Sequence, residues 1–164
     1  MTKRTIDDMV REVFPGREMA DVAVILDTSY LVGLPEEKYA RFLAGSKEYH
    51  FVITKAVEKE LHYQPKGITA PLITKPLKRF IYDQLQPEKI DYQATGSRKK
   101  FIKHACKKGC RKDEPISEAD MGQIAYAMEL QEKQRIPVVI LAEDSHIKGT
   151  VKELRKYGYN IFAL

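Results

Sequence analysis

The chain has 164 residues, of which 43% are hydrophobic and 31% charged, with a formal net charge of +5. This length predicts one domain, residues 1–164, that buries roughly 70% of its unfolded surface, and two cysteines exclude a disulfide framework. The first eight residues hold no apolar signal region, and no run approaches the roughly 20 apolar residues of a membrane span, so we expect a cytoplasmic protein with no membrane segment.

The hydrophobic pattern predicts strands that alternate with helices. The predicted strands are 22–26, 49–53, 89–92, 138–142 and 160–164. The predicted helices are 5–14, 36–43, a helix capped by Thr54, 71–85 with a break or kink at Pro76, 99–108, 117–133 and 145–157. Continuous apolar runs are typical of strands buried on both faces of a parallel sheet. The alternation therefore predicts an α/β fold, a three-layer α/β/α sandwich with a mostly parallel sheet.

Segment 63–115 is predicted to be a basic insert. Between residues 98 and 112 no acid interrupts a run of eight bases, which leaves 5 − 8 = −3 for the rest of the chain. These bases are Arg98, Lys99, Lys100, Lys103, Lys107, Lys108, Arg111 and Lys112. Such a patch is typical of a solvated helix face or of a nucleic-acid contact. The interleaved Tyr82, Tyr92 and Phe101 favour single-stranded nucleic acid, although Phe101 and Ile102 would also anchor a helix to the body.

Two aspartates stand where predicted strands end. Asp27 follows strand 22–26, and Asp144 follows strand 138–142. Since parallel strands end at one edge of their sheet, both carboxylates are expected at that edge, where α/β proteins bind ligands. Each aspartate taken alone is equally explained as the N-cap of the following helix.

Helical projection adds a third carboxylate. At about 100° per residue, Glu60 lies between Ala56 and Val57 on the apolar side, whereas Glu58 lies on the flank and is expected in solvent.

A fourth carboxylate opens the helix 117–133. Ser117 and Asp120 fit the spacing of a capping box, which by itself explains the acid. Asp120 also shares a helix face with Ile124 and Met128, so it points inward.

Four converging carboxylates repel one another unless a cation lies between them. Mg²⁺ and Mn²⁺ prefer such oxygen ligands, and a bound ion of this kind activates water for attack on a phosphate ester. The sequence contains no GxxxxGK[ST] loop and no GxGxxG turn, which excludes P-loop nucleotide hydrolysis. The pattern therefore indicates a metal-dependent hydrolase of phosphate esters.

Four segments in this order resemble the PIN domain nuclease family. They are VILDTS (24–29), ITKAVEKEL (53–61), ISEADMGQIAYA (116–127) and VILAED (139–144). The resemblance implies a Rossmann-like sandwich and an endoribonuclease that cuts single-stranded RNA, leaving a 5′-phosphate and a 3′-hydroxyl. It implies that Mg²⁺ or Mn²⁺ is held by the catalytic acids Asp27, Glu60, Asp120 and Asp144.

The same resemblance implies supporting residues and partners. Thr28 and Ser29 would support the site through their hydroxyls, and Glu143 through a further acidic or water-mediated contact. Many members carry a hydroxyl residue where this chain has Ala142. Both the VapC-type toxins, which pair with an antitoxin protein, and the ribosome-maturation branch are similar, and family analogy favours a homodimer.

Other functions are compatible with parts of the pattern. A non-catalytic RNA-binding or assembly module would keep the fold without cleavage. A phosphatase with Asp27 as nucleophile would need a second aspartate that Asp27-Thr-Ser lacks. His104, Cys106 and Cys110 fall short of a four-ligand zinc site, so reduced thiols are expected. His146 is expected at the surface.

Overall fold

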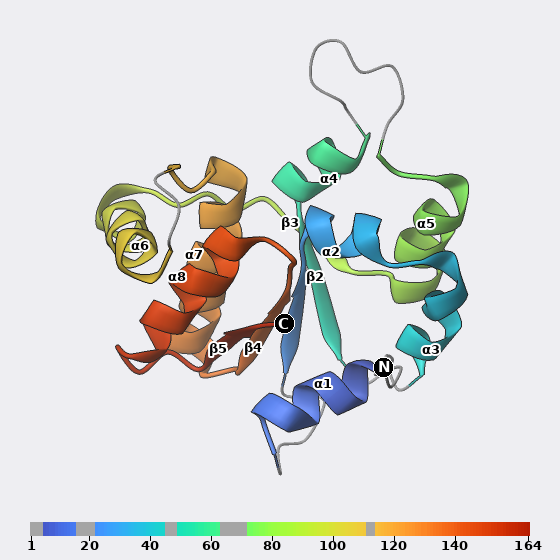
Figure 1. Ribbon diagram of the computed structural model, residues 1–164, viewed down its shortest axis with the longest axis horizontal. Helices are drawn as coiled ribbons and strands as arrows, with labels where there is room; N and C mark the ends of the chain where they lie inside the picture. The colour runs from blue at the N-terminus through green and yellow to red at the C-terminus, as the bar shows by residue number, and fades with distance from the viewer. Residues whose placement is uncertain (1–4, 16–21, 45–48, 63–71, 111–113) are drawn as a thin grey trace.

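The computed structural model describes residues 5–15, 22–44, 49–62, 72–110 and 114–164, and its centre is a five-stranded parallel sheet (Figure 1). The strand order is β3-β2-β1-β4-β5, and every pair of neighbours is parallel. The strands are β1 (Ala23–Leu26), β2 (His50–Thr54), β3 (Glu88–Ile90), β4 (Val138–Leu141) and β5 (Ile161–Ala163). This arrangement confirms the predicted parallel α/β fold.

Helices cover both faces of the sheet. One face carries α6 (Gly96–Gly109), α7 (Glu118–Gln134) and α8 (Ser145–Arg155), which stand together in Figure 1. The other face carries α1 (Ile6–Val13), α2 (Thr28–Gly33), η2 (Glu36–Lys38), α3 (Tyr39–Leu43), α4 (Lys55–His62), α5 (Lys75–Arg79) and the π-helical turn η4 (Phe80–Leu85). The molecule is thus the predicted three-layer sandwich.

The alternation of side chains along β1 explains why the strand is apolar throughout. Ala23 and Ile25 pack into the core beneath α6, α7 and α8, whereas Val24 and Leu26 pack into the opposite core. All four side chains are fully buried, because successive residues of a strand point to opposite faces and both faces are covered.

The structure corrects the prediction that Pro76 breaks a helix spanning 71–85. Pro76 lies in the first turn of α5, where a missing backbone N–H costs no hydrogen bond. Thr74 caps this helix by accepting a hydrogen bond from the Leu77 amide at 3.2 Å. The short helix α2 directly after β1 was not among the predicted elements, because its six residues are too few for a periodic pattern.

The described part of segment 63–115 supplies elements to the sheet and to both helical layers. It contributes the edge strand β3, whereas Phe80 of η4 is buried in one core and Ile102 of α6 in the other. Phe101 packs edge-on against Tyr157 with ring centroids 5.2 Å apart. The basic helix α6 is therefore anchored to the body along one side.

Within the described residues, no helix is both long enough and apolar enough to cross a membrane.

Candidate functional site

The candidate site lies where β1 and β4 end side by side. Leu26 pairs with Leu141 in the parallel register, and the Asp27 amide donates to the Leu141 carbonyl at 3.0 Å. From this pair the sheet continues to β2 on one side and to β5 on the other. Such a reversal of strand order opens a crevice at the carboxyl ends of the strands, which is the usual ligand position in this class of fold.

Asp27 is buried and held on both carboxylate oxygens. Oδ2 accepts hydrogen bonds from the Ser29 amide at 3.2 Å and the Ser29 hydroxyl at 2.5 Å, so Asp27 is the N-cap of α2. Oδ1 accepts from Nε2 of Gln123 at 2.7 Å. The capping explanation is therefore correct, but a cap needs only one oxygen, and the second is fixed from α7.

Gln123 is a site residue that the sequence interpretation missed. Its side chain is fully buried, and its Oε1 atom has no hydrogen-bond partner among the described residues. A glutamine one turn after Asp120, in the apolar stretch between Met121 and Ile124, was the available signal. A buried amide of this kind orients the carboxylate that it faces.

Asp144 caps α8 and stays about one-third exposed. Its Oδ1 atom accepts from the amides of His146 at 2.8 Å and Ile147 at 3.2 Å. Its second oxygen, Oδ2, receives neither of these bonds. His146 is buried, contrary to the expectation of a surface residue, because it packs under the first turn of α8 with Nδ1 3.8 Å from Asp144 Oδ1. Its Nε2 atom is buried without a hydrogen-bond partner in the described part of the chain.

The pKa of Asp120 is sensitive to the three other carboxylates. Burial raises the pKa of Asp120 to about 7, and Asp144, Asp27 and Glu60 add to the rise in that order. Ser117 opposes part of it by hydrogen bonding, and its hydroxyl accepts from the Asp120 amide at 3.1 Å. Because charges from three other elements act on this one carboxyl, all four predicted acids lie within electrostatic reach of one another.

Glu60 occupies the rim of this cluster. Glu60 is exposed, which corrects the prediction from helical projection that it points inward. The surrounding protein still removes enough hydration to raise the pKa of its carboxyl, and Asp27 and Asp144 raise that pKa further. The nearby Thr28 hydroxyl opposes part of the rise. The Thr28 hydroxyl is buried and forms no well-aligned hydrogen bond with any described residue. Its effect on Glu60 is therefore electrostatic.

The expectation that Glu58 lies in solvent was wrong. Its side chain is only 17% exposed, because η4 and β3 pack against this flank of α4. The Tyr82 hydroxyl donates to Glu58 Oε2 at 2.8 Å, and Lys89 Nζ lies 3.5 Å from the same oxygen. Helical projection finds the apolar side of one helix but not what covers its flank.

Ser29 joins the two strand ends. Its hydroxyl donates to Asp27 and accepts from the Glu143 amide at 3.0 Å. Glu143 itself is exposed and lies 3.7 Å from Lys148. Ala142 is fully buried, so the position at which the resemblance expected a hydroxyl contributes only packing, and Ser29 supplies the hydroxyl between the strands.

The chemistry of the cluster suits a hard divalent cation, although the side chains are not arranged as a finished site. No group of three or more His, Cys, Asp or Glu side chains in the described ranges has coordination spacing. Burial first, and then the neighbouring carboxylates, raise the pKa of Asp120 to about 7. The donor set is entirely carboxylate oxygen, which Mg²⁺ and Mn²⁺ prefer.

The basic residues of α6 divide into paired and free charges. Arg98 binds Glu132 through both guanidinium nitrogens at 2.7 and 2.5 Å, and Lys99 pairs with Glu118 at 2.5 Å. The exposed bases that form no ion pair with another described residue are Lys100, Lys103, Lys107 and Lys108. Arg111 and Lys112 lie outside the described residues. We call Lys100, Lys103, Lys107 and Lys108 the four-lysine face; that the eight predicted bases contact nucleic acid stays a prediction.

Zinc ligands do not assemble from His104, Cys106 and Cys110. His104 is exposed on α6 whereas Cys106 is buried two residues later, and the described residues hold no three-ligand group. The cysteines are free thiols, and their sulfur atoms lie 3.3 Å apart.

Comparison of the chain with models of known families, with characterised proteins and with solved structures finds no match.

Proposed function

We propose that the protein is a divalent-metal-dependent endoribonuclease of the PIN type that hydrolyses phosphodiester bonds in single-stranded RNA. The observation that carries the proposal is that Asp27 and Asp144 follow the neighbouring parallel strands β1 and β4, with Asp120 and Glu60 close enough to interact with both. Placing four carboxylates close together, with Asp27 and Asp120 buried, costs stability, and the packing of the fold does not require it. A cation offsets this cost.

The four acids would share the work of holding Mg²⁺ or Mn²⁺. When bound, such an ion activates a water and stabilises the leaving oxygen of a phosphodiester. Asp27 presents a fixed carboxylate, because Ser29 and Gln123 hold its two oxygens. Asp144 keeps Oδ2 free of the capping bonds and is part-exposed, so it can face both ion and solvent. Asp120 must lose its proton before it binds a cation.

The four-lysine face of α6 would bind the RNA backbone. The C-terminal end of α6 lies next to the first turn of α8, since Cys110 Sγ is 3.5 Å from the His146 carbonyl. Asp144 caps that same turn. RNA lying along Lys100, Lys103 and Lys107 would therefore run toward the acids. Lysine contacts of this kind follow the phosphates without reading sequence.

Cleavage of end-labelled single-stranded RNA in Mn²⁺ or Mg²⁺ tests the proposal. Asp27→Asn and Asp120→Asn should each lower the rate by more than about 100-fold, because even an indirect partner of a metal ligand is worth 10–100-fold. The exposed Asp83→Asn variant is the matched control and should cut at the rate of the unaltered protein. Cutting that persists in both site variants would overturn the proposal.

A non-catalytic RNA-binding module is the second candidate, and the four-lysine face favours it independently of the acids. It predicts salt-sensitive RNA binding with no metal-dependent cutting. The nuclease would act in one of two roles, as a toxin that pairs with an antitoxin protein or as an RNA-processing enzyme. We also propose that the protein is cytoplasmic and forms a homodimer.

A further inference from the structure

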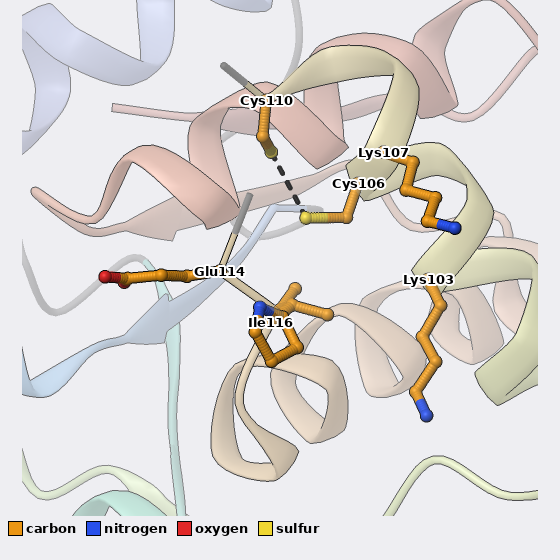
Figure 2. Close-up of a pocket in the computed structure, with 7 residues that line it drawn as sticks. Lys103, Cys106, Lys107, Cys110, Glu114 and Ile116 are labelled. Atoms are coloured by element: carbon orange, nitrogen blue, oxygen red, sulfur yellow. Dashed lines mark hydrogen bonds between the residues drawn. The ribbon is translucent and has the colours of Figure 1, made fainter. Parts of the chain in front are cut away.

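The two cysteines lie at the last turn of α6, and their sulfur atoms almost touch. Cys106 Sγ donates to Cys110 Sγ at 3.3 Å, and the Cys110 amide donates to the Cys106 carbonyl at 2.9 Å. Figure 2 shows the two thiols pointing toward one another across this turn. They are the only cysteines of the sequence, so any disulfide within one chain must join them.

A pocket of about 270 Å³ gives solvent molecules access to this pair. Cys106 and Cys110 form part of its wall, with Lys103 and Lys107 beside them and Glu114 across from them (Figure 2). Although Cys106 is only 5% exposed, it lines this pocket, whose volume admits a small oxidant.

Cys110 also contacts α8, the helix that Asp144 caps. Its sulfur lies 3.5 Å from the His146 carbonyl, 4.0 Å from the Ser145 carbonyl and 3.7 Å from Oγ1 of Thr150. Beside Cys110, α6 and α8 are in backbone contact at Gly109 and Gly149. A Cβ placed on Gly109 would lie 2.1 Å from the Gly149 carbonyl oxygen. A movement of Cys110 therefore acts on the first turn of α8.

We propose that Cys106 and Cys110 are a site of reversible oxidation, which closes to a disulfide under peroxide and loosens the first turn of α8. A disulfide holds its sulfurs about 2.05 Å apart, so the 3.3 Å pair must close, and Cys110 loses the thiol hydrogen that it donates to the α8 carbonyls. The inference rests on the sulfur geometry and not on the proposed nuclease activity.

The reaction balances with hydrogen peroxide as the oxidant. One thiol sulfur attacks a peroxide oxygen, the O–O bond breaks, and a sulfenic acid and one water form. The second thiol then attacks the sulfenic sulfur, the S–S bond forms, the S–O bond breaks, and a second water leaves. Two thiols and one peroxide thus give one disulfide and two waters, and a thiol reductant reverses the change.

Burial, followed by the hydrogen bond from Cys106, raises the pKa of Cys110 to about 11. Since thiolates are the reactive form, the pair resists oxidation at low peroxide.

The test treats the full chain with hydrogen peroxide, blocks free thiols by alkylation and measures the intact mass. The oxidised protein should be monomeric, lighter by two hydrogen atoms and protected at both cysteines, and a reductant should restore both alkylation sites. Cys106→Ser and Cys110→Ser should each retain one alkylatable thiol and show no such species. Two alkylated thiols, a disulfide-linked dimer or only over-oxidised sulfur in the unaltered chain would overturn the proposal.

Hydrogen exchange tests the second half of the proposal on the same samples. Peptides covering 145–150 should exchange severalfold faster in the oxidised chain, whereas peptides from the middle of α7 should not change. Cys110→Ser exposed to the same peroxide should show the exchange of its untreated form. A disulfide that leaves 145–150 unchanged would overturn the link between the thiols and α8.

Discussion

The buried amide of Gln123 donates to Asp27 Oδ1 at 2.7 Å and so joins α7 to the end of β1. The two residues are 96 positions apart in the chain. This bond fixes one carboxylate of the candidate site from the helix that also carries Asp120. It sets the orientation of Asp27 in the absence of any ligand, and it can be tested directly.

We expect Gln123→Leu to destabilise the fold by about 1–3 kcal/mol, because it leaves a buried carboxylate oxygen without its donor. Gln123→Glu should cost more, since it brings a further carboxylate against Asp27. Chemical denaturation measures both, with Gln134→Leu at the exposed end of α7 as the control. Equal stability of Gln123→Leu and the control would mean that the bond does not support Asp27.

The raised pKa of Asp120 predicts how stability depends on pH. The carboxyl titrates near its ordinary value of 3.8 when unfolded and at about 7 when folded, so the folded state favours the protonated form. The contribution of the Asp120 carboxyl to the free energy of unfolding is fully present below about pH 4, and it is lost as the pH rises through 7. The shift of about three units sets an upper limit of roughly 4 kcal/mol. Asp120→Asn should therefore stabilise the protein at pH 8 and change little at pH 4.

Thermal unfolding of Asp120→Asn across that pH range measures the effect, and exposed Glu37→Gln is the control. Mn²⁺ should stabilise the unaltered protein more at pH 8 than at pH 5, since the cation competes with the proton on Asp120. A metal response that is the same at both pH values would argue against binding at these acids.

Asp144 has two roles that substitution can separate. Asparagine caps helices about as well as aspartate, so Asp144→Asn should keep the stability of α8 but lose the charge needed for Mn²⁺. Asp144→Ala should lose the charge and also about 1 kcal/mol of stability, because the amides of His146 and Ile147 lose their acceptor. Chemical denaturation of both variants measures the capping role, and Mn²⁺ titration of both measures cation binding. Equal stability of the two variants would contradict the capping role.

The four-lysine face should account for RNA binding. Replacing Lys100, Lys103 and Lys107 by alanine should lower the salt dependence of log K by about 2, at about 0.7 per released counterion on a single strand. Replacing Lys38, Lys75 and Lys78, which are exposed on the opposite layer, removes the same charge and is the control. Equal losses in both triple variants would mean that only net charge attracts the RNA.

Gly109 and Gly149 allow α6 and α8 to touch through their backbones. Gly109→Ala should lower the free energy of unfolding by about 1–3 kcal/mol or more, because the new Cβ would clash with backbone atoms of Gly149. Gly33→Ala is the control, since nothing lies within 4 Å of a Cβ there. A small loss at Gly109 would show that the two helices can separate without cost.

Much of this protein could be predicted from its sequence because its signals are local. Apolar runs predict buried parallel strands, and the same runs correctly predicted that Asp27 directly follows β1 and that Asp144 lies shortly after the end of β4. The capping role of both aspartates was equally readable, since a cap depends on the residues directly after it.

Other features depended on packing between segments far apart in the chain, and only the tertiary structure decided them. Glu58 was expected in solvent because no helical wheel includes Tyr82, which covers it. Gln123 became a site residue through a partner in another element. The raised pKa of Asp120 comes first from its burial between packed layers and then from carboxylates on three other parts of the chain. Local sequence determined which residues carry charge or end a strand, whereas burial and the closeness of like charges arose only when the layers packed together.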